Sequence, residues 1–69
     1  MSASERREHG KVFHRIIDDR QPISEADLWS IAESVLGEWW DVETAREAFD
    51  DLIDDVEIEQ DRSENWWLT

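Results

Sequence analysis

Residues 49–68 read FDDLIDDVEIEQDRSENWWL, and the spacing of the apolar side chains changes within them. Up to Val56 the apolar residues recur at the three- and four-residue intervals of a helix. From Val56 to Glu59 they alternate with acidic residues, as in a strand with one buried face. Residues 61–64 indicate a turn, and residues 65–68 are typical of a returning strand. The stretch therefore predicts a helix that leads into a two-stranded β-hairpin.

One face of this hairpin has to pack on helices, because an isolated two-stranded hairpin is only marginally stable in water. Successive strand residues point to opposite faces. The face that we expect to be covered holds Val56, Ile58, Trp66 and Leu68. Trp67 falls on the other face with Glu57 and Glu59, so we expect it to be an exposed anchor for a protein partner.

Two further helices are predicted upstream of residue 41. The first covers residues 4–19 and ends at Gln21-Pro22, because the residue before a proline is pushed out of the helical region. Its apolar arc consists of Val12, Phe13, Ile16 and Ile17, with His9 at the N-terminal end. The second begins after Ser24, an N-cap residue, and ends at Gly37. Its apolar stripe consists of Leu28, Ile31, Ala32, Val35 and Leu36.

The third predicted helix begins after Asp41, which is a typical N-cap residue. Its apolar arc consists of Val42, Ala45, Ala48, Phe49, Leu52, Ile53 and Val56. The whole chain has 69 residues, which allows one small α+β domain over residues 1–69. We expect residues 1–4 and Thr69 to fray.

The charge of the chain is strongly acidic and unevenly distributed. It carries 19 acidic and 7 basic side chains, a formal charge of −12. Residues 1–24 hold five basic and four acidic side chains, whereas residues 25–69 hold two basic and fifteen acidic ones. Such a surface repels itself at low salt and is screened at molar salt. The balance resembles that of proteins from salt-loving archaea, and a halophilic origin is our expectation.

The order of elements resembles that of a winged helix-turn-helix domain. The resemblance rests on ISEADL (residues 23–28) and DVETA (residues 41–45), which open the second and third helices, and on residues 48–58 with Trp66 and Leu68. It covers roughly residues 10–69 and implies three helices, a C-terminal two-stranded β-hairpin and a role in transcription regulation. Two features depart from the family's pattern: the aromatic connection GEWW at residues 37–40 and an acidic third helix.

The resemblance implies that the third helix reads DNA, but its charge argues against this. Five carboxylates lie opposite its apolar arc, namely Glu43, Glu47, Asp50, Asp51 and Asp54. Contacts to phosphate normally come from basic or neutral donors, so this face repels DNA unless salt screens it. Asp50, Asp51 and Asp54 also have the Asp-Asp-x-x-Asp spacing of some magnesium sites, but so short a chain cannot enclose the large cavity that this chemistry needs. We interpret the five carboxylates as a solvated or partner-binding face.

One basic stripe remains for contacts with anions or DNA. Arg7, Lys11 and Arg15 recur every four residues opposite the first helix's apolar arc, and Arg62 lies in the hairpin turn. The alternative is that the stripe only forms pairs within the helix, such as Glu8 with Lys11.

Five tryptophans in so short a chain are the most unusual feature of its composition. They either enlarge a small core or anchor a partner, because Trp is enriched at binding hot spots. The adjacent Trp39 and Trp40 lie in a connection, where both are hard to bury, and with Trp67 they are our candidates for partner contacts.

No residue pattern indicates catalysis, a cofactor or a metal site. The chain has no cysteine, and His9 and His14 have the wrong spacing to ligate a metal from one helix face. No apolar run is long enough to span a membrane, and residues 1–9 do not resemble a signal peptide, so we expect a cytoplasmic protein. The leading hypothesis is a small regulatory module that binds a protein partner. The alternatives are a DNA-binding regulator adapted to high salt, including as a homodimer, and an acidic decoy that imitates DNA.

Overall fold

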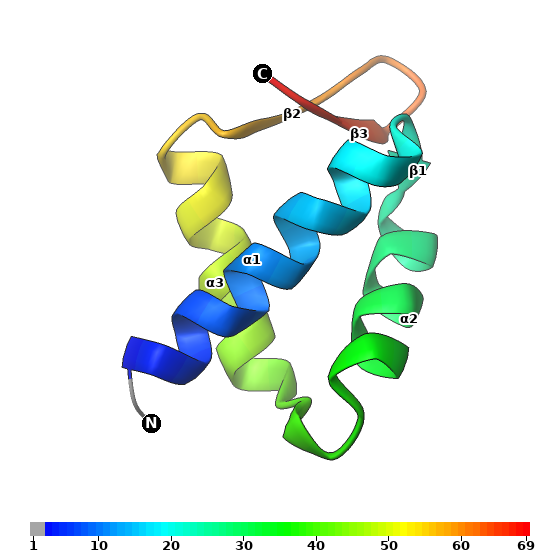
Figure 1. Ribbon diagram of the computed structural model, residues 1–69. Coiled ribbons are helices and arrows are strands. Elements are labelled where there is room, and N and C mark those ends of the chain that lie inside the picture. The colour runs from blue at the N-terminus through cyan, green and yellow to red at the C-terminus, as the bar shows by residue number, and fades with distance from the viewer. Residues whose placement is uncertain (1–2) are drawn as a thin grey trace.

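The structure of the protein is a computed structural model that describes residues 3–69. Three α-helices and three short strands follow one another along this part of the chain (Figure 1). They are α1 (Ala3–Arg20), β1 (Ile23–Ser24), α2 (Glu25–Leu36), the 3-10 turn η1 (Gly37–Trp39), α3 (Val42–Asp54), β2 (Ile58–Gln60) and β3 (Asn65–Leu68). The predicted α+β class is confirmed. Ala3 and Ser4, which we expected to fray, lie within α1, whereas residues 1–2 of that expected frayed end lie outside the described residues.

Helix α1 buries its predicted arc except for Val12, which is only half-buried against the core. The buried residues are His9, Phe13, Ile16 and Ile17. The helix ends where expected, and the Gln21 amide still donates to the Ile17 carbonyl oxygen at 2.7 Å. A cis peptide bond joins Gln21 to Pro22. This geometry turns the chain from α1 into β1.

Helix α2 begins and ends at the predicted residues but buries less of its stripe. The Ser24 hydroxyl accepts a hydrogen bond from the Asp27 amide at 3.3 Å, as expected of an N-cap. Gly37 ends the helix with a φ of 56°, a conformation that glycine adopts without strain. Leu28 and Ala32 are buried, but the prediction for Val35 is wrong, because this side chain is 62% exposed. Figure 1 shows α1 and α2 diverging towards the C-terminal end of α2, so α1 does not cover its last turn.

Helix α3 packs closely against α1 through small side chains. Its buried residues are Thr44, Ala45, Ala48, Phe49 and Leu52. A Cβ placed on Gly10 of α1 would lie 4.0 Å from the Ala48 Cβ, in ordinary contact. The predicted apolar arc is too wide, because Val42 and Ile53 at its edge are exposed. The buried arc is narrower because α1 covers only the side of α3 that carries the small residues.

The end of α3 corrects the predicted start of the hairpin. The Val56 amide donates to the Ile53 carbonyl at 3.1 Å and the Glu57 amide to the Leu52 carbonyl at 3.0 Å. This pair of bonds is the Schellman ending of a helix. Val56 occupies its left-handed position, with a φ of 55°, and is 67% exposed. The strand therefore begins at Ile58 and not at Val56, and Val56 does not belong to the covered face.

The sheet has three antiparallel strands in the order β1-β3-β2, where the sequence predicts two. β1 pairs Ile23 with Trp66, and β2 pairs Ile58 with Leu68. Ile23, Ile58 and Trp66 are buried on the helices, and Leu68 packs against the same core. Because β1 is a two-residue strand, it has no alternation that its sequence could reveal. It ties the C-terminal hairpin to the α1–α2 connection.

Aromatic rings fill the centre of the core. Phe13 lies 5.2 Å from Trp29 and 5.3 Å from Phe49, measured between ring centroids. Phe49 in turn meets Trp66 edge-on at 5.0 Å. Edge-to-face contacts of this kind add to the burial of apolar area. The core therefore joins all three helices to the sheet.

Candidate functional site

The two adjacent tryptophans of the α2–α3 connection have opposite environments. Trp40 packs against the core and meets Trp29 edge-on at 5.6 Å between ring centroids. Trp39, in η1, is 72% exposed. The turn at Gly37 and η1 together direct one indole inwards and the next outwards. Of the three tryptophans proposed as partner contacts, Trp39 is therefore the one that the structure leaves exposed.

A hollow lies beside Trp39, between the diverging ends of α1 and α2. Its volume is about 360 Å³. It is lined by Ser4, Glu5, Glu8, His9, Leu36 and Trp39. We call it the Trp39 hollow. The hollow therefore combines an aromatic residue from η1 with two carboxylates from α1.

His9 forms the closed floor of this hollow. Its side chain is 2% exposed, and both ring nitrogens are engaged. Nδ1 lies 2.7 Å from the Glu5 carbonyl oxygen, so it carries the proton and donates, and Nε2 accepts from the Asp41 amide at 3.2 Å. His9 therefore connects α1 to the start of α3 and leaves no ring nitrogen for a ligand.

Asp41 stands at the N-cap position of α3, as predicted. Its carboxylate accepts a hydrogen bond from the Thr44 hydroxyl at 2.5 Å. This bond, with the amides of Glu43 and Thr44, holds the pKa of Asp41 below its ordinary value. The cap and His9 together fix where α3 begins and so where the connection before it lies.

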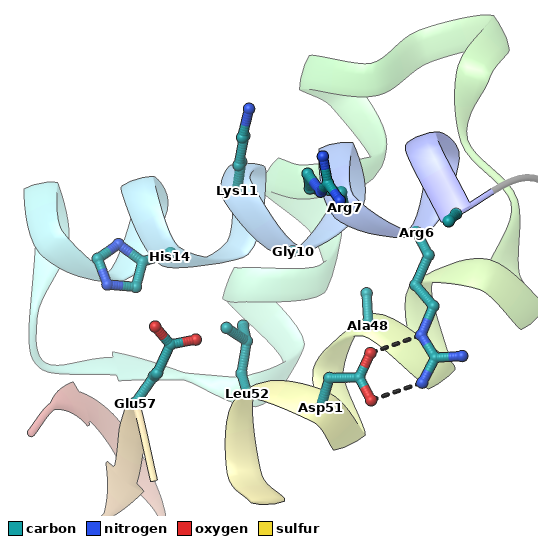
Figure 2. Close-up of a pocket in the computed structure, with 10 residues that line it drawn as sticks. Arg6, Arg7, Gly10, Lys11, His14, Ala48, Asp51, Leu52 and Glu57 are labelled. Atoms are coloured by element: carbon teal, nitrogen blue, oxygen red, sulfur yellow. Dashed lines mark hydrogen bonds and ion pairs between the residues drawn. The ribbon is translucent and has the colours of Figure 1, made fainter. Parts of the chain in front are cut away.

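Two of the five carboxylates on the acidic face of α3 form ion pairs with α1. Arg6 of α1 donates two hydrogen bonds to the Asp51 carboxylate at 2.5 Å (Figure 2). Its guanidinium also lies 3.6 Å from Glu47. The hydrogen bond from Arg6 lowers the pKa of Asp51. The other three predicted residues, Glu43, Asp50 and Asp54, are exposed.

Sequence reasoning missed Arg6 because it considered α1 and α3 separately. Arg6 falls within the apolar arc of α1 on the helical wheel, between Phe13 and Ile17, so its side chain points towards a neighbouring helix. That position was the available signal, but only the packing of α1 against α3 shows which carboxylate it meets.

The basic stripe lies exposed along α1 and is partly paired within the helix. Arg7, Lys11 and Arg15 are exposed, and the Lys11 ammonium lies 3.7 Å from the Glu8 carboxylate, as the pairing alternative expects. Arg7 and Lys11 border a groove of about 500 Å³ between α1 and α3. Figure 2 shows the Lys11 side chain extending away from α3.

The same groove also holds carboxylates. Asp51 and Glu57 line it together with His14, so its charge is mixed. Arg62 lies in the turn between β2 and β3, at the opposite end of the molecule from the first turns of α1 (Figure 1). The structure therefore does not bring Arg62 together with Arg7.

Trp67 is half-buried and has a partner within the chain. It pairs with Glu59 across the hairpin, on the face predicted for it. Its indole N–H donates to Asp61 Oδ2 at 2.8 Å. Asp61 Oδ1 also accepts from the Ser63 and Asn65 amides at 2.8 and 3.0 Å, so this carboxylate organises the turn.

No cluster of three or more metal-ligating side chains occurs among residues 3–69. Within the same residues, no helix combines the length and the apolar character needed to cross a bilayer. Comparison with protein-family models, with curated protein sequences and with solved structures finds no match to this chain.

Proposed function

We propose that this chain is a regulatory interaction module of the winged helix-turn-helix type, associated with transcription, that acts by binding another protein. The observation that carries the proposal is the contrast between its surfaces. The exposed side of α3 presents carboxylates, whereas an exposed tryptophan borders an apolar hollow elsewhere. The first surface repels nucleic acid, and the second has the character of a protein-binding anchor.

The element order supports the winged-helix part of this proposal. A helix, a second helix, a short connection and a third helix precede the C-terminal hairpin. The pairing of β1 with β3 attaches that hairpin to the helices, so it is a fixed part of the domain. A winged helix-turn-helix domain with this element order would use α3 as its recognition helix.

The charge of α3 disfavours DNA as the ligand. Glu43, Asp50 and Asp54 lie on its exposed side, and Arg46 is the one basic residue of this helix. A recognition helix lies between two rows of phosphates in the major groove. Three exposed negative charges there oppose binding at any salt concentration that does not screen them.

A titration of labelled duplex DNA with the protein tests this proposal. We expect no change in fluorescence anisotropy from about 0.1 M to about 1 M salt. Binding that weakens steeply as salt rises would instead support the DNA-binding alternative, because counterion release has that signature.

The acidic-decoy alternative requires a separate variant. Changing Glu43 to Gln together with Asp50 and Asp54 to Asn removes the exposed charge but leaves the carboxylates that Arg6 holds. A decoy loses its partner in this variant. A module that binds through the Trp39 hollow keeps its partner.

A further inference from the structure

We infer that the Trp39 hollow is a docking site for a basic amphipathic segment of a partner protein. An apolar side chain of that segment enters the hollow, while its lysine or arginine side chains meet the carboxylates of α1 and the face of the Trp39 indole. This inference rests on the proposed function, since it names the class of partner and the surface that receives it.

The apolar part of the site comes from the end of α2 and from η1. Leu36 is half-buried in the wall of the hollow, and Trp39 stands exposed at its edge. Val35, one residue before Leu36, is also exposed. Neither Val35 nor Trp39 belongs to the core cluster or packs against it. Their burial by a partner therefore adds apolar contact without disturbing the fold.

The floor of the hollow favours an apolar side chain over a polar one. His9 closes it, and both of its nitrogens are already hydrogen-bonded within the chain. A polar group entering from a ligand would find no partner on this ring and would lose its hydration. An aliphatic side chain avoids that loss.

Charge around the hollow selects a basic segment. Glu5 and Glu8 line it, Glu38 neighbours Trp39 in η1, and no lysine or arginine is among its lining residues. The Glu8 carboxylate pairs with Lys11 at 3.7 Å, but both side chains are largely exposed. Such surface pairs contribute little free energy, so a partner's lysine or arginine can replace Lys11. An exposed indole face additionally attracts a cation.

The same charge disfavours two other occupants. A second copy of the chain brings another formal charge of −12 to the contact, and nucleic acid brings its phosphates. Both are repelled by the carboxylates at the hollow, Glu5 and Glu8, and by Glu38 beside it. A basic segment is attracted by the same field, which also speeds its association.

The walls of the hollow are held in place before any partner arrives. On one side His9 fixes α1 to the first residue before α3. On the other, the Gly37 amide donates to the Glu33 carbonyl at the end of α2. A site formed in advance loses less conformational entropy on binding than a mobile one. We assign the contact to the hollow and not to the hairpin because Trp39 is exposed, whereas Trp67 is half-buried and already donates to Asp61.

Fluorescence anisotropy with a labelled synthetic peptide tests the inference. The probe is an amphipathic peptide of leucine and lysine, measured against the full chain at about 0.15 M salt. Two further peptides serve as controls: in one, serine replaces every leucine, and in the other, glutamate replaces every lysine. We expect binding of the first peptide and at least tenfold weaker binding of both controls.

Three variants locate the bound peptide. Trp39→Ala is expected to weaken binding about tenfold or more, because an exposed aromatic anchor is lost. Glu5→Gln with Glu8→Gln is expected to weaken binding and to reduce its dependence on salt. The matched control is Val56→Ala, which alters an equally exposed apolar residue outside the hollow and is expected to leave the affinity unchanged.

Other results overturn the inference. Failure of the leucine–lysine peptide to bind, or equal binding by the serine peptide, excludes a basic amphipathic partner. Unchanged affinity in Trp39→Ala excludes this hollow, and the proposed function then survives with another surface. A dimer in sedimentation that Trp39→Ala abolishes identifies a second copy as the occupant. The proposed function itself fails only if duplex DNA binds in the separate titration.

Discussion

Val56 has a backbone conformation that its side chain disfavours. It is β-branched and adopts a φ of 55° at the end of α3, where glycine is the usual residue. Left-handed backbone costs a residue with a Cβ about 1–2 kcal/mol, whereas glycine adopts it freely. We expect Val56→Gly to raise the free energy of unfolding by about 0.5–1 kcal/mol, after the larger backbone entropy of an unfolded glycine is subtracted. Urea unfolding followed by tryptophan fluorescence measures this.

Val35→Ala is the control for the loss of an exposed valine. Val35 has a similar exposure but lies within α2. Its replacement is expected to change stability by less than about 0.5 kcal/mol. If both variants shift stability equally, or if Val56→Gly destabilises, Val56 is not strained.

Asp61 makes the stability of the hairpin turn depend on pH. Its hydrogen bond from the Trp67 indole, with those from the Asn65 and Ser63 amides, lowers its pKa below the ordinary value of 3.8. A carboxyl whose pKa is lowered on folding stabilises the protein above its unfolded pKa. That contribution disappears as pH falls through the lower folded pKa. We expect Asp61→Asn to lower the melting temperature at neutral pH.

The difference between the wild type and Asp61→Asn is the informative quantity, because acid also removes the repulsion among the other carboxylates. This difference should shrink as the pH falls below about 4. Thermal melts of both chains at several pH values provide it. A difference that stays constant down to strong acid would show that the charge of Asp61 does not support the turn.

The environments of single residues were only partly predictable. Ser24 and Gly37 act locally, through turns that their own chemistry favours, and both were predicted. Trp39 and Trp40 are chemically identical neighbours in a connection without periodicity, so their opposite directions depend on the backbone of η1. Arg6 acts across two helices, and its partners depend on how α1 meets α3.

At the scale of the elements, Trp66 anchors the sheet. It is buried, contacts Phe49 edge-on and pairs with Ile23 of β1. We expect Trp66→Ala to cost about 3–5 kcal/mol, as large-to-small changes in a core do. Trp39→Ala should cost less than about 1 kcal/mol, because this side chain lies outside the core. Denaturant unfolding of the two variants checks this, and similar losses would contradict the assigned core.

The stability loss expected for Trp67→Ala lies between the losses expected for Trp66→Ala and Trp39→Ala. Trp67 is half-buried and donates to Asp61, so we expect Trp67→Ala to cost about 1–2 kcal/mol. Its role as a partner anchor stays a prediction, although its indole N–H already has an acceptor within the chain.

The long helices were predictable as elements, whereas their edges were not. Periodic spacing identifies α1, α2 and α3, because each repeats its pattern over several turns. It overestimates the buried arc at Val35, Val42 and Ile53, since burial there depends on whether another element reaches that turn. The third strand, Ile23–Ser24, is too short to carry a pattern and exists only because β3 lies beside it.

At the scale of the whole molecule, the net charge makes the melting temperature depend on salt. Fifteen acidic side chains lie in residues 25–69, and Arg6 pairs with only two of them among the ion pairs found in residues 3–69. Screening of the remaining repulsion is expected to raise the melting temperature by at least about 5 °C between about 0.1 M and about 1 M salt. Thermal melts followed by tryptophan fluorescence measure this.

The triple variant of Glu43, Asp50 and Asp54 serves as the control for this salt effect. With three of the exposed charges removed, its melting temperature should depend less on salt than that of the wild type. A wild-type melting temperature that does not respond to salt would contradict the halophilic interpretation and leave the fold unaffected.

The most direct test of the central claim is a proton–nitrogen NMR spectrum of the indole N–H groups, recorded with the leucine–lysine peptide and then with duplex DNA. Trp39 reports on the hollow, Trp67 on the hairpin and Trp66 on the core, while the backbone amides in the same spectrum report on α3. If a protein segment binds at the hollow, the peptide shifts the Trp39 signal and leaves the buried Trp66 signal in place. Duplex DNA shifts neither signal. An unchanged Trp39 signal with saturating peptide, or DNA-induced shifts of the α3 backbone amides, would contradict the claim.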